Sequence, residues 1–441
     1  MKKKIKILRK TKSYCPECLK VLDSRVVEDD GLLFIVKECP EHGNFKESFI
    51  WEDKQTDETM INLTPNIKQQ PNGLILNITS DCNMKCRFCY ENTAMKQGYH
   101  LNIKDIEKKL KNFKGKLIYL SGGEPTTHKD FFKIVRFIKN KGYEVIVLSN
   151  GKMFSKEDFT KMAKKAGVDA VVIGLDSLNN DTLKFFKGEY ALDFKLDAIT
   201  NLEKYDIVVV LYVMCIRGRN LEDLSDLVRF AIKHNTIKRI NFVPPWERGK
   251  RSKIHDKVTV NDILQEIKNN FNMTKKDFLE FSVFLHLIYD VLNKFRRKNI
   301  NIEAICHLKI WFICFNESEI IPLNHMFDIK KMNIFLKSLK DADSFTEFLK
   351  SFKYFPLLSL IQDFKDDMHF RKFVKGIFKS LFFGGELEKL LPLKSINICC
   401  VPTERNIDLH YIETCNLYSD SPYNYHTYPT CIRQIMIEKT L

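Results

Sequence analysis

Between residues 74 and 243, short apolar runs alternate with segments whose apolar residues recur every three or four positions. The runs have the length of strands, and segments such as Lys129–Ile138 and Leu221–Val228 have the period of amphipathic helices. Strands joined by helical crossovers form a parallel sheet. The pattern therefore predicts an α/β fold with strands at residues 74–79, 116–120, 144–149, 169–175, 207–213 and 237–243.

The first 55 residues carry two short cysteine motifs in place of this pattern. Cys15-Pro-Glu-Cys18 and Cys39-Pro-Glu-His42 have the spacing of zinc ribbons and rubredoxins. Apolar runs between them flank Asp30-Gly31, which predicts a β-hairpin with this pair at its turn. A module this short has too little core to fold alone, so one metal ion, Zn or Fe, would hold it together. The expected ligands are Cys15, Cys18, Cys39 and His42, with a surface role as the alternative for the histidine. Residues 56–71 are polar and contain two prolines, so we expect a linker there.

Three closely spaced cysteines follow the first strand of the predicted sheet: Cys82, Cys86 and Cys89. Three thiolates at these spacings can ligate three irons of a four-iron, four-sulfur cube and leave the fourth iron open for a substrate to chelate. Ferredoxin sites close that position with a fourth cysteine. The loop lies past the carboxyl end of a strand, where the active sites of parallel α/β barrels gather. The sequence therefore predicts an iron–sulfur catalytic site here.

A glycine-rich motif, Ser121-Gly122-Gly123-Glu124-Pro125, follows the second predicted strand. Adjacent glycines let the backbone approach a ligand closely, and the Glu124 carboxylate could hold an ammonium group. Polar residues also end later strands, where a turn or cap role is the alternative to ligand contact. These residues are Ser149, Asn150, Asp176 and Ser177, and Tyr212 and Met214 stand at the end of the fifth strand.

Together, the three-cysteine loop and the Gly-Gly-Glu-Pro motif resemble the radical S-adenosylmethionine (SAM) superfamily over residues 72–250. The resemblance implies a partial (β/α)6 barrel whose open iron chelates the amine and carboxylate of SAM. It also implies that residues 122–125 bind the amino group of SAM and that Phe88 lies beside the adenine. An electron from a ferredoxin- or flavodoxin-type donor would split the sulfonium and release a 5′-deoxyadenosyl radical. The protein then positions the substrate, while the cofactor carries the chemistry.

The length, cysteine content and net charge of the chain indicate its number of domains, its location and its partners. The chain has 441 residues, more than one hydrophobic core usually fills, so two or three domains are expected. It shows neither a signal peptide nor an apolar run of about 18 residues, which indicates a cytosolic protein. Thirteen cysteines there point to metal or redox chemistry. The net charge of +15 is mainly due to lysine, and we attribute it first to solubility; contact with a membrane surface is an alternative, and nucleic acid is not an expected partner.

The region from residue 251 to residue 441 is expected to form a helical, cysteine-containing cap that selects the substrate. Its cysteines suffice for an auxiliary four-iron cluster, with a free thiol as the alternative for Cys399 or Cys400, because adjacent residues seldom ligate one cube together. The expected ligands are Cys306, Cys314, Cys415 and Cys431. Phenylalanines and lysines alternate at helical spacing over residues 345–383. This stretch is either the core of the cap or an apolar groove for a long-chain substrate with a basic rim.

The N-terminal metal module, the radical SAM core and the late cysteines together resemble a narrower, archaeal-type family. It comprises tetraether lipid synthases and proteins described as dihydro-hydroxymethylpterin dimethyltransferases. The resemblance implies carbon–carbon bond formation between isoprenoid lipid chains at the membrane periphery. The alternative is radical methylation of a pterin or a similar small molecule. A third activity, peptide maturation, is disfavoured because the C-terminal half has no Cys-x-x-Cys motif.

Overall fold

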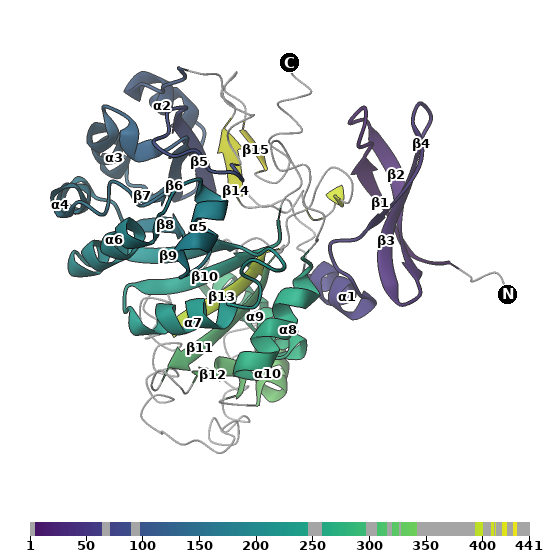
Figure 1. The fold of residues 1–441 in the computed structure, drawn as a ribbon. Coiled ribbons are helices and arrows are strands. Elements are labelled where there is room, and N and C mark those ends of the chain that lie inside the picture. The colour runs from purple at the N-terminus through teal and green to yellow at the C-terminus, as the bar shows by residue number, and fades with distance from the viewer. Residues whose placement is uncertain are drawn as a thin grey trace.

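We analysed a computed structural model of the chain, which contains a small N-terminal sheet and a large α/β domain (Figure 1). The structure describes residues 5–63, 71–89, 98–245, 258–296, 307–314, 320–325, 328–341, 393–399, 407–409, 411, 417–420 and 427–429. The three-cysteine loop and the Gly-Gly-Glu-Pro motif lie on the large sheet, and the first two cysteine motifs lie on the small one.

Four antiparallel strands in chain order form the N-terminal sheet. They are β1 (Lys6–Tyr14), β2 (Val21–Asp29), β3 (Leu32–Cys39) and β4 (Gly43–Ser48). Asp30 and Gly31 join β2 to β3 with φ angles of 54° and 78°, and two consecutive positive φ angles are the signature of a tight hairpin turn. The predicted hairpin and its turn residues are therefore confirmed.

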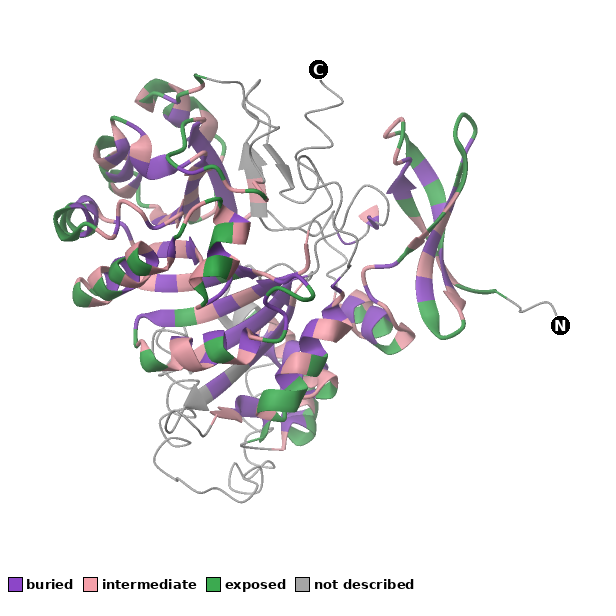
Figure 2. Cartoon of the chain, in the orientation of Figure 1, coloured by how far each residue is buried: buried purple, intermediate pink, exposed green. Residues whose placement is uncertain are grey.

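The large sheet has eleven strands in the order β12-β11-β13-β10-β9-β8-β7-β6-β5-β14-β15. Its six central strands are parallel and confirm the predicted strands with small shifts at their ends. They are β5 (Gly73–Thr79), β6 (Leu117–Gly122), β7 (Glu144–Ser149), β8 (Ala170–Gly174), β9 (Val208–Met214) and β10 (Ile237–Val243). The crossover helices are α2 (Ile103–Leu110), α3 (Phe131–Asn140), α4 (Glu157–Ala166), α5 (Asn180–Lys187), α6 (Leu192–Lys204) and α7 (Leu224–Lys233). Figure 2 shows that these strands are largely buried and that the outer faces of the helices are exposed.

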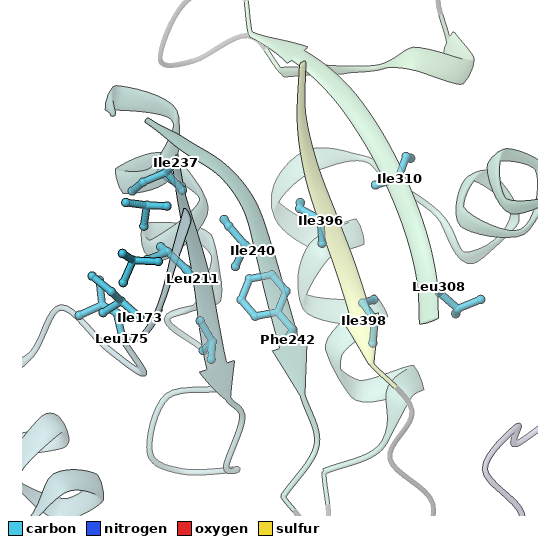
Figure 3. Packing of buried hydrophobic residues seen from close by; sticks show 14 of the residues in the cluster. Ile173, Leu175, Leu211, Ile237, Ile240, Phe242, Leu308, Ile310, Ile396 and Ile398 are labelled. Atoms are coloured by element: carbon cyan, nitrogen blue, oxygen red, sulfur yellow. The ribbon is translucent and has the colours of Figure 1, made fainter. Parts of the chain in front are cut away.

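The C-terminal region differs from the helical cap that we expected, because it also extends the sheet at both edges. It supplies the helices α8 (Val260–Phe271), α9 (Lys275–Arg296) and α10 (Ile329–Asp341). It also supplies the strands β11 (His307–Cys314), β12 (Ile320–Pro322), β13 (Leu393–Cys399), β14 (Leu417–Asp420) and β15 (Thr427–Pro429). β13 lies parallel to β10, and the alternating apolar residues Ile396 and Ile398 continue the core row of Ile240 and Phe242 (Figure 3). Burial of that apolar face explains the extension.

Part of the stretch expected to be a linker is a helix, α1 (Lys54–Leu63). Its Asp57 is buried and accepts two hydrogen bonds from the Arg9 guanidinium of β1, at 3.1 and 3.0 Å. Arg9 also lies 2.6 Å from Asp408, and the Tyr411 hydroxyl donates a 2.8 Å bond to Asp57. This buried network of charges fixes α1 between the N-terminal sheet and the C-terminal segment, which a flexible linker could not do.

Several predictions concern residues outside the described part of the chain. These are the auxiliary-cluster ligands Cys306, Cys415 and Cys431 and the phenylalanine-rich residues 345–383. Cys314 ends β11, but its side chain is not described. The auxiliary cluster therefore stays a prediction. Among the described residues, no helix combines the length and apolar character needed to cross a membrane.

Candidate active site and metal centre

Four ligand atoms come together where β1 turns into β2 and β3 turns into β4, and all lie within 4.8 Å of one another. They belong to Cys15, Cys18, Cys39 and His42. The Sγ atoms of Cys18 and Cys39 are 3.8 Å apart, and His42 Nδ1 lies 3.8 Å from Cys15 Sγ and 3.5 Å from Cys39 Sγ. A tetrahedral zinc ion with bonds of about 2.3 Å places its sulfur ligands about 3.8 Å apart. The four side chains therefore fit one tetrahedral ion, as predicted.

The loop that carries Cys82, Cys86 and Cys89, called the cysteine loop below, follows the carboxyl end of β5 and contacts the end of α5. The backbone N–H of Arg87 donates a 3.0 Å hydrogen bond to the Phe186 carbonyl. The Phe88 ring lies 5.7 Å from the rings of both Phe185 and Phe186. These contacts fix the segment between Cys86 and Cys89. Phe88 is thus packed on α5, and its predicted place beside the adenine of SAM stays a prediction.

The glycine motif at the end of β6 packs directly on the strand end that precedes the cysteines. Gly123 N–H donates to Thr79 O at 2.8 Å, and Glu124 N–H donates to Asp81 O at 2.7 Å. Gly122 has a φ of +127°, and a Cβ there would lie 2.1 Å from Thr79 O. Both the backbone angle and the close approach require glycine. The motif therefore holds the cysteine loop in place through Asp81, one residue before Cys82.

Glu124 is almost completely buried, at 1% exposure, and its carboxylate accepts four hydrogen bonds from the protein. The donors are Thr126 N–H (3.3 Å), Thr126 Oγ1 (2.6 Å), Ser149 Oγ (2.9 Å) and Asn150 N–H (2.7 Å). Burial raises the pKa of Glu124 above its ordinary value, although these bonds favour the charged form. Glu124 thus ties the end of β6, including the short helix Pro125–Thr127, to the end of β7. Its predicted contact with an ammonium group remains untested.

The other polar residues predicted at strand ends form links between neighbouring loops. Asn150 Nδ2 donates a 2.8 Å hydrogen bond to Asn83 Oδ1, which connects the end of β7 to the cysteine loop. Asp176 accepts a 2.9 Å bond from Met214 N–H and lies 2.5 Å from the Lys187 ammonium. Ser177 Oγ accepts a bond from Asn179 N–H, a turn role. The structure brings Asn150 to the cysteine loop and Asp176 to a lysine beside it.

Two lysines place positive charge next to Cys86. Lys187 ends α5 and pairs with Asp176, and Lys195 of α6 is completely buried. Lys195 Nζ donates a 2.7 Å hydrogen bond to Asn150 O. Burial of the Cys86 thiol raises its pKa, and the charges of Lys187 and Lys195 oppose that shift. Buried cations near the loop favour a thiolate-ligated, anionic group there.

The residues present fit an iron–sulfur cluster and SAM. Cys82 is exposed as a residue, and Cys86 and Cys89 are partly buried. Desolvation around the Cys82 thiol raises its pKa to about 11, and the Glu124 carboxylate adds to the shift. Binding of iron would therefore displace protons from protonated thiols. Gly122 and Gly123 allow this turn to pack directly on residues 79–81, because a Cβ at either position would clash with the backbone there.

Lys187 and Lys195 were not predicted from the sequence as site residues. A signal for Lys195 does exist, because it shares a helical stripe with Ala198, Ile199 and Leu202, all of which are buried. A lysine on such an apolar stripe needs a partner in the folded protein, and here the partner is a carbonyl at the end of β7. Lys187 ends a helix and shows no comparable pattern in the sequence.

Known protein families match two parts of the chain, the one with the cysteine loop and the N-terminal sheet. Residues 76–231 match the family model described as Radical SAM superfamily, and residues 7–52 match the HMPTM N-terminal zinc ribbon domain. A 7,8-dihydro-6-hydroxymethylpterin dimethyltransferase of Methanocaldococcus jannaschii is 24% identical over 73% of this chain and 71% of its own. A probable GTP 3′,8-cyclase of Pyrococcus abyssi is 30% identical over 38% of this chain and 55% of its own.

Among solved structures, Streptococcus suis SuiB bound to S-adenosylmethionine aligns with a TM-score of 0.40 and 19% identity. The alignment covers 45% of this chain and 46% of SuiB. The chain thus spans about half the length of the cyclase and of SuiB.

Proposed function

Because this chain is a radical SAM superfamily enzyme, we propose that it methylates a heterocycle that carries a 2-amino-4-oxopyrimidine edge, as pterins do, with SAM as both the radical source and the methyl donor. The observation that supports this substrate class is the character of the open face of the sheet next to the SAM motifs. Tyr212 of β9 is 40% exposed there, and Asn241 of β10 is its register partner. Ligand sites that bind polar rings offer a few fixed hydrogen-bonding groups. An isoprenoid chain would instead require an apolar lining.

The names of the relatives support the same class. The dimethyltransferase is named for a pterin, and the cyclase is named for GTP. Pterin and guanine share the 2-amino-4-oxopyrimidine edge, although they differ in the fused second ring. The relative named for a pterin also aligns with the larger part of this chain.

Three groups of residues would have different roles in the cleavage of SAM. A four-iron cluster on Cys82, Cys86 and Cys89, when bound, supplies the electron that splits the sulfonium of SAM. The turn at Gly122 and Gly123 packs on residues 79–81 and so holds the cysteine loop in place. Lys187 and Lys195 place positive charge on the side of Cys86, and a ferredoxin- or flavodoxin-type protein would deliver the electron.

In the N-terminal sheet we propose a structural zinc ion on Cys15, Cys18, Cys39 and His42. The match to a zinc ribbon family favours zinc over iron. Four protein ligands fill a tetrahedral site, so no position remains for a substrate. This ion would stabilise the small sheet and take no part in the chemistry.

Carbon–carbon bond formation on membrane lipids is the second candidate. It depends on the phenylalanine-rich residues 345–383, whose spacing suits an apolar groove. The basic balance of the chain would then favour an anionic membrane surface. An auxiliary cluster on the late cysteines is compatible with either candidate.

One anaerobic assay separates the two candidates. Reconstituted protein is incubated with SAM, a reductant and one of three substrates: 6-hydroxymethyl-7,8-dihydropterin, GTP, or an ether-lipid extract. We expect methyl gain on the pterin, detected by mass spectrometry, together with release of 5′-deoxyadenosine. Loss of hydrogens from the lipid, with an unchanged pterin, would instead establish the second candidate.

A further inference from the structure

A row of side chains crosses five neighbouring strands at the carboxyl ends of the parallel strands. Register pairs connect Gly174 of β8 to Tyr212, Tyr212 to Asn241, Asn241 to Asn397 of β13, and Asn397 to Lys309 of β11. Register partners on adjacent strands project to the same face of a sheet. Adjacent strands lie about 4.8 Å apart, so one small molecule can contact neighbouring members of the row.

This row faces away from the hydrophobic core. The residues that alternate with it are Leu211, Ile240, Ile396 and Ile398, which are fully or almost fully buried and belong to the core (Figure 3). Tyr212, in contrast, is exposed in the middle of an eleven-stranded sheet. A central strand normally has both faces covered in a parallel sheet. The exposed tyrosine therefore marks a part of this face that protein atoms leave accessible.

Two amide oxygens in the row accept no hydrogen bond from the part of the chain that the structure describes. The Oδ1 atoms of Asn241 and Asn397 are buried, and no described residue donates to either. Asn397 as a whole is 1% exposed. Buried polar atoms are nearly always paired, so each exception requires an explanation. Neighbouring acceptors without donors are explained by a ligand that brings N–H groups.

The row is continuous with the SAM-binding end of the sheet. Gly174 precedes Asp176 by two residues, and Asp176 accepts the hydrogen bond from Met214 N–H that joins the ends of β8 and β9. Asp176 also pairs with Lys187, whose charge reaches Cys86. A molecule held on Asn241 and Asn397 would thus lie on the sheet that carries the cysteine loop.

We propose that Asn241 and Asn397 bind the N–H donors of the 2-amino-4-oxopyrimidine edge of the substrate. This inference rests on the proposed function and assigns its substrate subsite. Amide side chains recognise such edges through hydrogen bonds, as asparagine does with adenine in nucleic acids. Lys309, the next residue in the row, is buried, and its ammonium suits the 4-oxo group of the same edge. A hydrocarbon chain has no donor for the two amide oxygens.

Equilibrium binding tests the subsite independently of turnover. Reconstituted protein is titrated anaerobically with 6-hydroxymethylpterin, with GTP, and with the deaminated pterin, which lacks the 2-amino group. We expect the wild type to bind the pterin and to lose about tenfold in affinity for the deaminated ring, the effect of one lost hydrogen bond. Asn241→Leu and Asn397→Leu should each weaken pterin binding by about tenfold or more. The variant of whichever asparagine contacts the amino group should no longer discriminate between the two pterins.

The control is Asn270→Leu on the exposed side of α8, which should leave pterin affinity unchanged. Iron content and SAM affinity confirm that each variant is folded. If the wild type binds pterin and all variants bind it equally well, the subsite is wrong while the proposed function stands. Equal wild-type affinity for the two pterins would also overturn the subsite, even if a leucine variant failed to fold. If the wild type binds neither pterin nor GTP, the proposed function fails and the subsite fails with it. Tighter binding of GTP than of pterin would keep the subsite and change the substrate to a guanine nucleotide.

Discussion

The buried ammonium of Lys195 donates a 2.7 Å hydrogen bond to the backbone carbonyl of Asn150. The same Asn150 donates from its side chain to Asn83 in the cysteine loop and from its backbone to Glu124 in the glycine motif. One loop at the end of β7 therefore connects a buried cation to both motifs of the candidate site. Any change in the charge of Lys195 acts next to Cys86.

The charge of Lys195 predicts a pH dependence of stability. Burial, followed by the nearby charge of Lys187, lowers the pKa of Lys195 from an ordinary 10.5 to about 7. Between these values the unfolded chain binds the proton and the folded chain does not, so stability rises with pH in this window. In Lys195→Met this contribution is absent. Without bound cluster or SAM, the wild-type free energy of unfolding should therefore increase relative to the variant from pH 7 to pH 9. Denaturant titrations at both pH values provide the measurement, and an equal difference at the two would contradict the assignment.

Because Gly122 packs closely against Thr79, adding one methyl group at position 122 should strongly destabilise the protein. In Gly122→Ala the new Cβ would meet Thr79 O at 2.1 Å, and the φ of +127° adds strain. We expect a loss of about 3–5 kcal/mol in the free energy of unfolding and a loss of SAM affinity. Gly142→Ala is the matched control, because its φ of +88° is also positive but no atom lies within 4 Å of the new Cβ. It should lose only about 1–2 kcal/mol. Equal losses in the two variants would show that the contact with Thr79 is unimportant.

The cysteine loop predicts that one thiol is indispensable for the cluster. Cys86→Ala should abolish iron binding at this loop, the electron paramagnetic resonance signal of the reduced cluster, and release of 5′-deoxyadenosine from SAM. The control is Cys215→Ala. Cys215 is completely buried at the end of β9 and its pKa is raised by burial, so it is not a candidate ligand. SAM cleavage by the Cys86 variant would refute the site.

We predict that the metal ion at the N-terminal sheet can be lost without loss of iron from the cysteine loop. Cys18→Ser should lose about one zinc ion per chain, measured by elemental analysis, because four ligands close the tetrahedral site. Iron bound at Cys82, Cys86 and Cys89 should remain. The metal-binding end of the small sheet should become sensitive to proteases, since the separate buried cluster there consists of Cys15, Leu22 and Cys39 with Cys18 and Phe45 packed against it. Unchanged zinc content would show that the four side chains do not bind the ion.

The buried charge network at α1 predicts that Arg9 stabilises the attachment of the N-terminal sheet. Arg9→Met leaves Asp57 and Asp408 buried without their cation, which should cost about 3–5 kcal/mol. Lys20→Met is the control in the same sheet, because the pair of Lys20 with Glu41 is exposed and should contribute little. Thermal unfolding of the two variants gives the comparison. A stable Arg9 variant would mean that α1 is held by its apolar contacts alone.

The central strands were predictable because each carries its own apolar run and each crossover helix carries its own period. The strands that the C-terminal region adds to the sheet were not, because β13 depends on a partner, β10, that is far away in sequence. The run Leu393–Cys399 alternates apolar and polar residues, but nothing local identifies which strand it joins. The cysteine and glycine motifs were recognisable for the opposite reason, since their chemistry depends on spacing within a few residues.

The hydrogen-bond partners of the polar residues around these motifs could not be predicted from the sequence. Glu124 was predicted to face a ligand, yet its carboxylate is bound by donors from two loops that the sequence does not place together. The role of Asn397 likewise depends on Asn241 across the sheet. Lys195 could have been found, because a lysine on a buried helical stripe is conspicuous.

The two edges of the central parallel sheet are covered by strands that follow it in the sequence. β13 pairs with β10 at one edge, and β14 pairs with β5 at the other. While the ribosome is still synthesising the region before residue 393, both β5 and β10 would expose unpaired backbone to other nascent chains. Until β13 and β14 have paired with them, these exposed edges favour aggregation during expression. Truncations that remove these late strands should therefore precipitate even though they retain every cysteine of the central loop.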